Sequence, residues 1–202
     1  MTQHRRTVLG LLAALPLGQR AFAQTPQPRV RIETPRGVIV VELQADKAPI
    51  TAGNFLRYVD EGRYAGGVFY RALRLGFAPE KGLLQGGLNG IETRALPPIA
   101  HEPTSQTGLS HKDGTVSMAR FDPGTAKCEF FICLGDSPYF DADPKQPGDN
   151  LGFAAFAQVV EGMDVVRALH QLPVSETEGE AYGMKGQILA PPVPITAISR
   201  AV

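Results

Sequence analysis

The chain has 202 residues, of which 43% are hydrophobic and 20% charged, a composition that fits one folded domain of ordinary size. Its 20 basic and 20 acidic residues leave no net charge, which argues against the positive surface of a nucleic-acid-binding protein. The 22 glycines and 17 prolines are spread along the chain, so many short strands and turns are favoured over a helical bundle.

Residues 1–23 have the layout of a signal peptide. Arg5 and Arg6 precede an apolar stretch from Val8 to Leu17, and small residues follow up to Ala23. The apolar stretch is about half the roughly 20 residues that a membrane-spanning helix needs, so we expect export without a membrane anchor. The paired arginines resemble a twin-arginine signal, and the general secretory route remains open. Cleavage after Ala23 would leave the mature protein in the periplasm or outside the cell.

Residues 24–29 are predicted to be a linker and residues 30–202 a single domain. A helix should open at Ala48-Pro49, bury Phe55 and Val59, and end near Gly62, and a second helix should cover residues 163–171. Strands are expected at 30–33, 38–43, 67–73, 83–85, 115–119, 130–134, 153–160 and 195–198, and long loops at 74–82, 142–150 and 174–186. This pattern predicts a mainly β fold, a closed eight-stranded antiparallel β-barrel capped by two α-helices, because closure removes exposed strand edges.

The two cysteines, Cys128 and Cys133, lie five residues apart in a strand-like run. Five strand residues span about 16 Å, and an odd offset places the two side chains on opposite faces. A disulfide requires Cα atoms within about 7 Å. We therefore expect two buried thiols.

Signatures of several catalytic classes are missing from the sequence, which has no nucleophile elbow, phosphate-binding loop or zinc-binding helix. His101, His111 and His170 show no metal-ligand spacing, so no metal or cofactor is expected. Strand parity instead groups two sets of residues, each on one face of its strand: Phe69, Arg71 and Leu73, and Glu129, Phe131 and Cys133.

Five motifs occur in order along the chain: Tyr64 to Leu73, Gln85-Gly86-Gly87, Gly114 to Arg120, Glu129 to Ile132, and Phe153 to Asp164. Together they resemble the cyclophilin-type peptidyl-prolyl cis-trans isomerases, from about Arg31 to the C-terminus. The resemblance implies an eight-stranded barrel with two helices and an enzyme that rotates Xaa-Pro bonds. It also implies that the partners are proline-containing segments of folding proteins, here exported ones. The oligomeric state stays open, with a monomer as the default expectation.

The resemblance also implies the site. Arg71 matches the catalytic arginine, Gln85 the glutamine beside it, and Phe131 the aromatic floor of the proline pocket. The other residues expected to bind substrate are Leu83, Ala119, Arg120, Glu129, Tyr139, Phe140 and Phe153.

Four departures from the family pattern affect this site. Tyr70 replaces a histidine, Glu129 a glutamine and Arg120 an asparagine, and the chain between Arg71 and Gln85 is about six residues longer than usual. Because a buried carboxylate is costly unless paired, we expect Glu129 to pair with Arg71 or Arg120. These changes leave an alternative function open, a non-catalytic peptide-binding or chaperone module, although the retained Arg71, Gln85 and Phe131 favour the enzyme.

Overall fold

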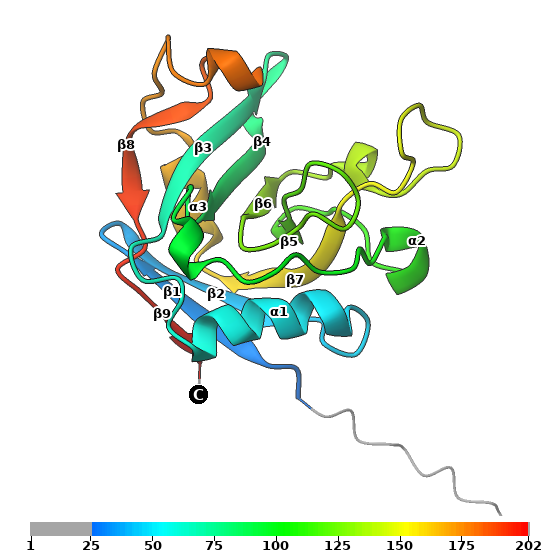
Figure 1. Ribbon diagram of the computed structural model, residues 1–202. Coiled ribbons are helices and arrows are strands. Elements are labelled where there is room, and N and C mark those ends of the chain that lie inside the picture. The colour runs from blue at the N-terminus through cyan, green and yellow to red at the C-terminus, as the bar shows by residue number, and fades with distance from the viewer. Residues whose placement is uncertain (1–25, 202) are drawn as a thin grey trace, which may run out of the picture.

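The computed structural model describes residues 26–201, so the predicted signal peptide lies outside the described part of the chain. Nine antiparallel strands form one strongly curled sheet (Figure 1). They are β1 (Arg29–Thr34), β2 (Gly37–Leu43), β3 (Val68–Leu75), β4 (Ala78–Gly87), β5 (Thr115–Met118), β6 (Phe130–Leu134), β7 (Ala154–Glu161), β8 (Ile188–Pro194) and β9 (Ala197–Arg200). The helices are α1 (Pro49–Asp60), α2 (Thr104–Thr107) and α3 (Met163–His170), with 3-10 turns η1 (Glu92–Arg94), η2 (Pro138–Phe140) and η3 (Glu180–Tyr182). Among residues 26–201, none of these helices has the length and apolar character needed to span a bilayer.

The mainly β, antiparallel fold is confirmed, but the strand count and the closure differ from the prediction. The sheet order is β8-β3-β4-β6-β5-β7-β2-β1-β9, which leaves β8 and β9 at its two ends. These two strands are consecutive in the chain, and the residues between them bond to opposite edges. Ile195 N–H donates to Gly67 O beside β3 at 2.8 Å, and Thr196 N–H donates to Glu33 O in β1 at 2.9 Å. A corner of the chain therefore completes the curl. The strand expected at 195–198 corresponds to β9, and β8 precedes it as an additional strand.

The sequence pattern does not predict β8, because three of its seven residues are proline. Proline has no N–H to donate, so it is tolerated at the edge of a sheet and seldom in a central strand. β8 occupies such an edge, since β3 is its one strand partner among the described residues and its other side makes an isolated bridge between Val174 and Leu189.

The predicted loop at 74–82 is instead the far end of the β3–β4 hairpin, which was a wrong prediction. β3 runs to Leu75 and β4 starts at Ala78, with Gly76 and Phe77 at the tip. β6 pairs with β4 only from Gly82 to Gly86, so Ala78–Lys81 has no partner on its second side. That free edge accommodates Pro79. The other two predicted loops, 142–150 and 174–186, are loops in the structure, the second carrying η3.

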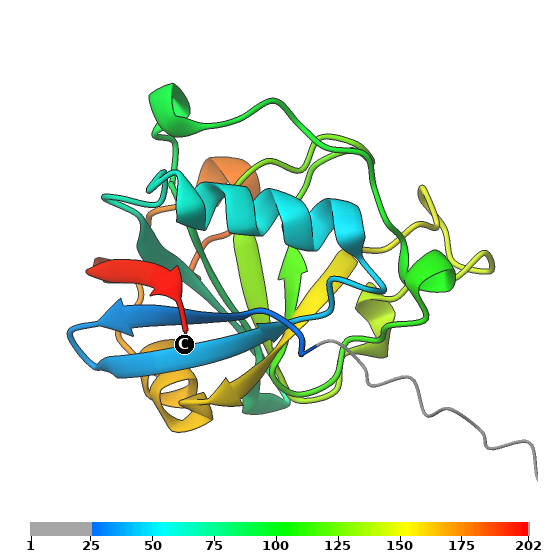
Figure 2. The same ribbon diagram turned by 90° about the horizontal axis from the view of Figure 1, so that it is seen from below.

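The two longer helices lie on opposite sides of the β1–β2 hairpin (Figure 2). α1 begins with Pro49, whose missing N–H costs nothing in a first turn, and buries Phe55, Tyr58 and Val59 against the sheet. α3 buries Val166, Leu169 and His170, as its periodicity predicts. α2 is a short addition that the sequence analysis did not predict.

Strand alternation divides the apolar residues into two clusters. The large core contains Phe130, Ile132 and Cys128, whereas Phe131 and Cys133 belong to a small cluster on the other face of the sheet. The two cysteines are thus free, buried and on opposite faces, as predicted. The face that carries the small cluster also carries the candidate site.

Candidate functional site

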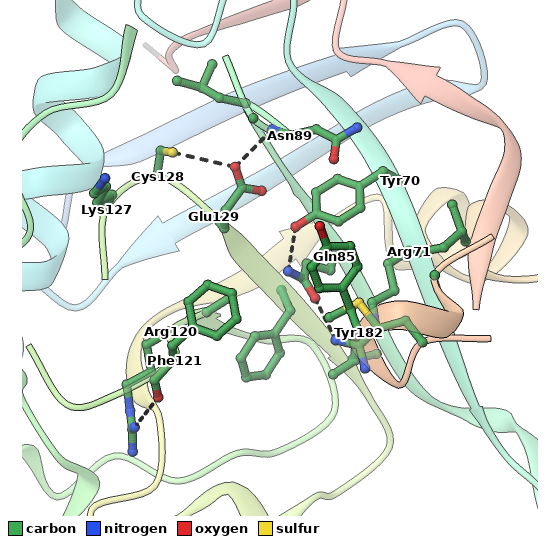
Figure 3. A pocket seen from close by; sticks show the side chains of 18 of the residues that line it. Tyr70, Arg71, Gln85, Asn89, Arg120, Phe121, Lys127, Cys128, Glu129 and Tyr182 are labelled. Carbon is green, nitrogen blue, oxygen red and sulfur yellow. Dashed lines mark hydrogen bonds between the residues drawn. The ribbon is translucent and has the colours of Figure 1, made fainter. Parts of the chain in front are cut away.

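A cavity of about 980 Å³ lies on this face of the sheet (Figure 3). It brings together nine of the ten residues predicted for the site: Arg71, Leu83, Gln85, Ala119, Arg120, Glu129, Phe131, Phe140 and Phe153. Its volume is at the upper end of the range for small-molecule pockets, so it has room for more than one amino-acid residue.

The tenth predicted residue, Tyr139, does not line the cavity. Its side chain is 56% exposed and its ring packs on that of Phe140, with centroids 4.5 Å apart. Because Tyr139 and Phe140 are neighbours in the turn η2, only one of them can face inward. Tyr139 therefore supports Phe140 from outside.

Aromatic rings form the floor of the cavity. The ring centroid of Phe131 lies 5.2 Å from that of Phe140 and 5.3 Å from that of Phe153, both in edge-to-face geometry. Such pairs contribute about 0.5–1.5 kcal/mol beyond the area they bury. The result is a rigid apolar floor.

His111 holds Phe131 from behind. It is fully buried, its ring is stacked on that of Phe131 at 6.0 Å, and its two nitrogens bond Asp141 Oδ1 at 2.6 Å and Ser117 Oγ at 2.9 Å. Burial lowers the pKa of His111, opposed by Asp141. Because Ser117 is also fully buried, this serine, histidine and aspartate set supports the floor and is closed to substrate.

A β-bulge in β3 determines which side chains reach the cavity. Phe69 pairs with Gly86 and Arg71 with Gln85, so Tyr70 is an extra residue in β3 with no opposite residue in β4. Both Tyr70 and Arg71 consequently face the cavity, while Phe69 belongs to the large core. The expectation that Phe69 and Arg71 share a face was wrong, because a bulge interrupts strand parity and re-aims the residues after it.

A line of hydrogen bonds fixes Arg71 (Figure 3). Arg71 Nη1–H donates to Gln85 Oε1 at 3.0 Å, and Gln85 Nε2–H donates to the Tyr70 hydroxyl at 2.5 Å. Arg71 Nε–H donates to Gln187 Oε1 at 2.8 Å. Burial lowers the pKa of Arg71, although a guanidinium stays charged at neutral pH. Arg71 is thus a held cation whose two protein acceptors are neutral amides.

Arg120 lines the cavity but is already engaged elsewhere. Its guanidinium forms a two-point ion pair with Asp149, at 2.8 and 2.9 Å, and its Nε–H donates to Gly152 O at 2.9 Å. It also lies 5.3 Å from the centroid of the Phe153 ring. Arg120 therefore fastens the 142–152 loop and Phe153 to the rest of the site.

The predicted pairing of Glu129 with Arg71 or Arg120 was wrong. Glu129 Oε1 accepts the Asn89 backbone N–H at 2.9 Å, while Oε2 is buried and has no hydrogen-bond partner among the described residues. Burial raises the pKa of Glu129, and the facing Tyr70 hydroxyl partly offsets this. Neither arginine forms an ion pair with Glu129 among the described residues: Asp149 engages Arg120, and Gln85 and Gln187 orient Arg71.

Some residues of the site were missed by the sequence analysis, among them Gln187, Tyr182 and Met184. Tyr182 and Met184 line the cavity from the 174–186 loop, which strand and motif signals do not cover. No sequence signal joins Arg71 to Gln187, because 116 positions separate them. Within residues 26–201, no three His, Cys, Asp or Glu side chains gather as metal ligands would.

Comparisons with known proteins agree on one family. Residues 29–197 match the family model described as cyclophilin type peptidyl-prolyl cis-trans isomerase/CLD. A peptidyl-prolyl cis-trans isomerase of Acinetobacter baylyi is 33% identical over 93% of this chain and 92% of its own length. Peptidyl-prolyl cis-trans isomerase A of Dickeya dadantii is 34% identical over 82% of this chain and 81% of its own.

Solved structures agree on the fold. A cyclophilin-type isomerase of Cryptosporidium parvum, crystallised in the presence of the dipeptide Ala-Pro, matches with a TM-score of 0.67. The match covers 86% of this chain and 99% of that one at 20% identity.

Proposed function

The chain belongs to the cyclophilin-type peptidyl-prolyl cis-trans isomerases, and we propose that Arg71 is the catalytic residue of this activity. The reaction rotates an Xaa-Pro peptide bond, so no covalent bond breaks and no proton has to move. The obstacle is the amide resonance, which gives a barrier of about 18–20 kcal/mol. An enzyme for this step must favour the twisted amide over both planar forms.

Twisting makes the prolyl nitrogen pyramidal and gives it a lone pair that can accept a hydrogen bond. In the proposed mechanism Arg71 donates that bond only in the twisted state, which is differential binding of the transition state. Of the five N–H donors of its guanidinium, two bond to Gln85 and Gln187, and the others have no acceptor among the described residues. This charged donor, held in place but not neutralised, is the observation that carries the proposal.

The apolar floor would hold the proline ring. Phe131, Leu83, Phe140 and Phe153 supply an apolar surface in the cavity that Arg71 lines, and Ala119 packs against the same cluster. Excluding water strengthens the charged hydrogen bond from Arg71. The preceding carbonyl can then swing while the ring stays in place.

We further propose that the enzyme assists the folding of exported proteins, with proline-containing segments of unfolded chains as its partners. The support is the signal-peptide layout of residues 1–23, which would deliver the protein to the periplasm or the outside of the cell.

A non-catalytic peptide-holding role is the weaker proposal. Such a module would need the cavity and its aromatic floor. It would not need an arginine whose charge is uncompensated and whose guanidinium is held by two glutamines. The arrangement around Arg71 therefore favours catalysis.

The test is cis-to-trans exchange of a short Xaa-Pro peptide, followed by NMR with the purified protein. Arg71→Ala should lower turnover a hundredfold or more, on the scale of about 10²–10³ for losing one transition-state donor, without changing the melting temperature appreciably. Arg57→Ala, which changes an exposed arginine on α1, is the matched control and should keep full activity. Unchanged exchange in Arg71→Ala would refute the catalytic role of Arg71, and line broadening without exchange in the unsubstituted protein would favour peptide holding.

A further inference from the structure

The loop that precedes β8 carries the second hydrogen-bond partner of Arg71. Gln187 lies where the 174–186 loop rejoins the sheet, next to Ile188, which pairs with Arg71 in the β3–β8 ladder. Its backbone is fixed on both sides: its N–H donates to Met184 O at 3.0 Å, and its carbonyl accepts the Ala72 N–H at 2.8 Å. These two backbone hydrogen bonds therefore hold Gln187 beside Arg71.

Two fixed points determine the plane of a guanidinium, whereas one leaves it free to pivot. Gln85 Oε1 holds Nη1 at 3.0 Å from β4, and Gln187 Oε1 holds Nε at 2.8 Å from the other side of β3. β3 lies between β4 and β8 in the sheet, so the two glutamines approach Arg71 from opposite neighbours. The three other N–H groups of the guanidinium, on Nη1 and Nη2, are left without an acceptor among the described residues.

The chemistry of the acceptor matters as much as its position. An amide oxygen accepts a hydrogen bond without bringing a negative charge, so the full positive charge of Arg71 stays available to a substrate. The contrast is Arg120 in the same cavity, whose partner is the carboxylate of Asp149. Glutamine at position 187 orients the cation without neutralising it.

We propose that Gln187 is a positioning residue for the isomerase reaction. The 174–187 segment then contributes directly to the active site. The proposal rests on the proposed catalytic role of Arg71. Gln187 acts through Arg71 and sets the direction of its free donors. Its loss should reduce kcat and leave KM nearly unchanged, because the apolar floor that binds the proline ring is intact.

The first test compares Gln187→Ala with a matched control, Gln171→Ala, which changes an exposed glutamine outside the cavity. We expect kcat for Gln187→Ala to fall about tenfold or more, since small misplacements of a reacting group cost up to about 10²-fold, with KM within about twofold. The Arg71 Nε–H resonance should also move and exchange faster with water. Unchanged kcat with a changed resonance would overturn the proposal.

Gln187→Glu separates the position of the acceptor from its charge. Its carboxylate can still accept the Nε–H bond, but it adds a negative charge beside Arg71, and the guanidinium keeps that carboxyl ionised at neutral pH. We therefore expect kcat of Gln187→Glu to fall about tenfold or more at pH 7, with KM nearly unchanged and the Arg71 Nε–H resonance still protected from exchange with water. An ordinary kcat for Gln187→Glu would contradict the proposal.

Arg71→Ala in the same assay separates the two proposals. If Arg71→Ala is as active as the unsubstituted protein, the catalytic role of Arg71 fails and the role of Gln187 fails with it. If Arg71→Ala is inactive and both Gln187 variants have ordinary activity, only the positioning role fails.

Discussion

Arg71 and Arg120 line the same cavity, yet their surroundings give them different chemistry. Arg71 bonds to the neutral side chains of Gln85 and Gln187, so its charge is available to a bound peptide. Arg120 has a side chain that is 5% exposed and pairs with Asp149, which compensates its charge. An arginine lining a cavity is therefore a candidate catalyst only when its hydrogen-bond partners leave its charge uncompensated.

The surroundings of Glu129 also determine what its side chain can do. Its unpaired Oε2 is buried, so substrate cannot reach it without a rearrangement. We expect Glu129→Gln to keep turnover within about threefold, or about 0.7 kcal/mol, when measured by peptide exchange. A loss well beyond this would show that Glu129 contacts substrate or restrains Arg71.

The same substitution should change how stability depends on pH. Burial raises the folded-state pKa of Glu129 above 4.5, so the folded state binds this proton more tightly than the unfolded state does. The resulting stabilisation is present below pH 4.5 and is lost as the pH rises through the raised pKa. In urea titrations, Glu129→Gln should therefore gain stability relative to the unsubstituted protein across that window, and the gain should level off above it.

At the scale of elements, an irregularity in one strand and a loop fastened by one ion pair shape the site. The bulge at Tyr70 turns both Tyr70 and Arg71 toward the cavity. Arg120 binds Asp149 and Gly152, and so fixes the 142–152 loop that leads into Phe153. The floor of the cavity thus depends on a loop that has no regular secondary structure of its own.

Replacing Arg120 tests the fastening of this loop. Arg120→Met keeps an unbranched stem but removes the ion pair and the cation beside Phe153, so we expect KM to rise about fivefold, or about 1 kcal/mol, with kcat little changed. Asp149→Asn is the matched control and should have a smaller effect, because the bonds from Arg120 to Gly152 O remain. Unchanged KM in Arg120→Met would show that the loop keeps its place without this arginine.

The ion pair between Arg120 and Asp149 stabilises the fold over a defined pH range. Hydrogen bonds from Arg120 lower the pKa of Asp149 from 3.8 to about 2. A lowered carboxyl pKa gives stability that is present above pH 3.8 and is lost as the pH falls toward 2. KM of the unsubstituted protein should therefore show no step from this pair between about pH 5 and 8.

At the scale of the whole molecule, the fold is held together by strand pairing and apolar packing, and both cysteines are free. The chain between β8 and β9 bridges the two ends of the sheet, and apolar residues cover both faces of β6. Cys128 and Cys133 contribute to different clusters on those two faces. No disulfide is needed, so the same fold can form in a reducing or an oxidising compartment.

Mass spectrometry of the protein expressed with its full N-terminus tests two predictions, cleavage after Ala23 and the presence of two free thiols. We expect a chain that begins at Gln24 and carries two free thiols. Burial raises the pKa of both thiols to about 12, so alkylation of the native protein at pH 8 should be at least about a thousandfold slower than that of an ordinary cysteine. After unfolding in urea, both thiols should react. A longer N-terminus would contradict cleavage after Ala23, and one reactive thiol or none after unfolding would contradict the free state.

The sequence by itself determined the features that depend on neighbouring residues. Periodicity located α1 and α3, parity separated Phe130 from Phe131 and the two cysteines from each other, and ordered motifs indicated the family and Arg71. Parity and periodicity repeat every two or nearly four residues, so they can be recognised in a single strand or helix, and each motif is a short run of neighbouring residues.

Only the tertiary structure decided which groups surround those residues. The bulge at Tyr70, the partners of Glu129 and Arg120, the outward position of Tyr139 and the contact between Arg71 and Gln187 all depend on segments far apart in the chain. A hydrogen bond across 116 positions leaves no periodic trace, because it is set by how β8 docks beside β3. The sequence therefore indicated the catalytic candidate, and the docking of strands determined what holds it in place.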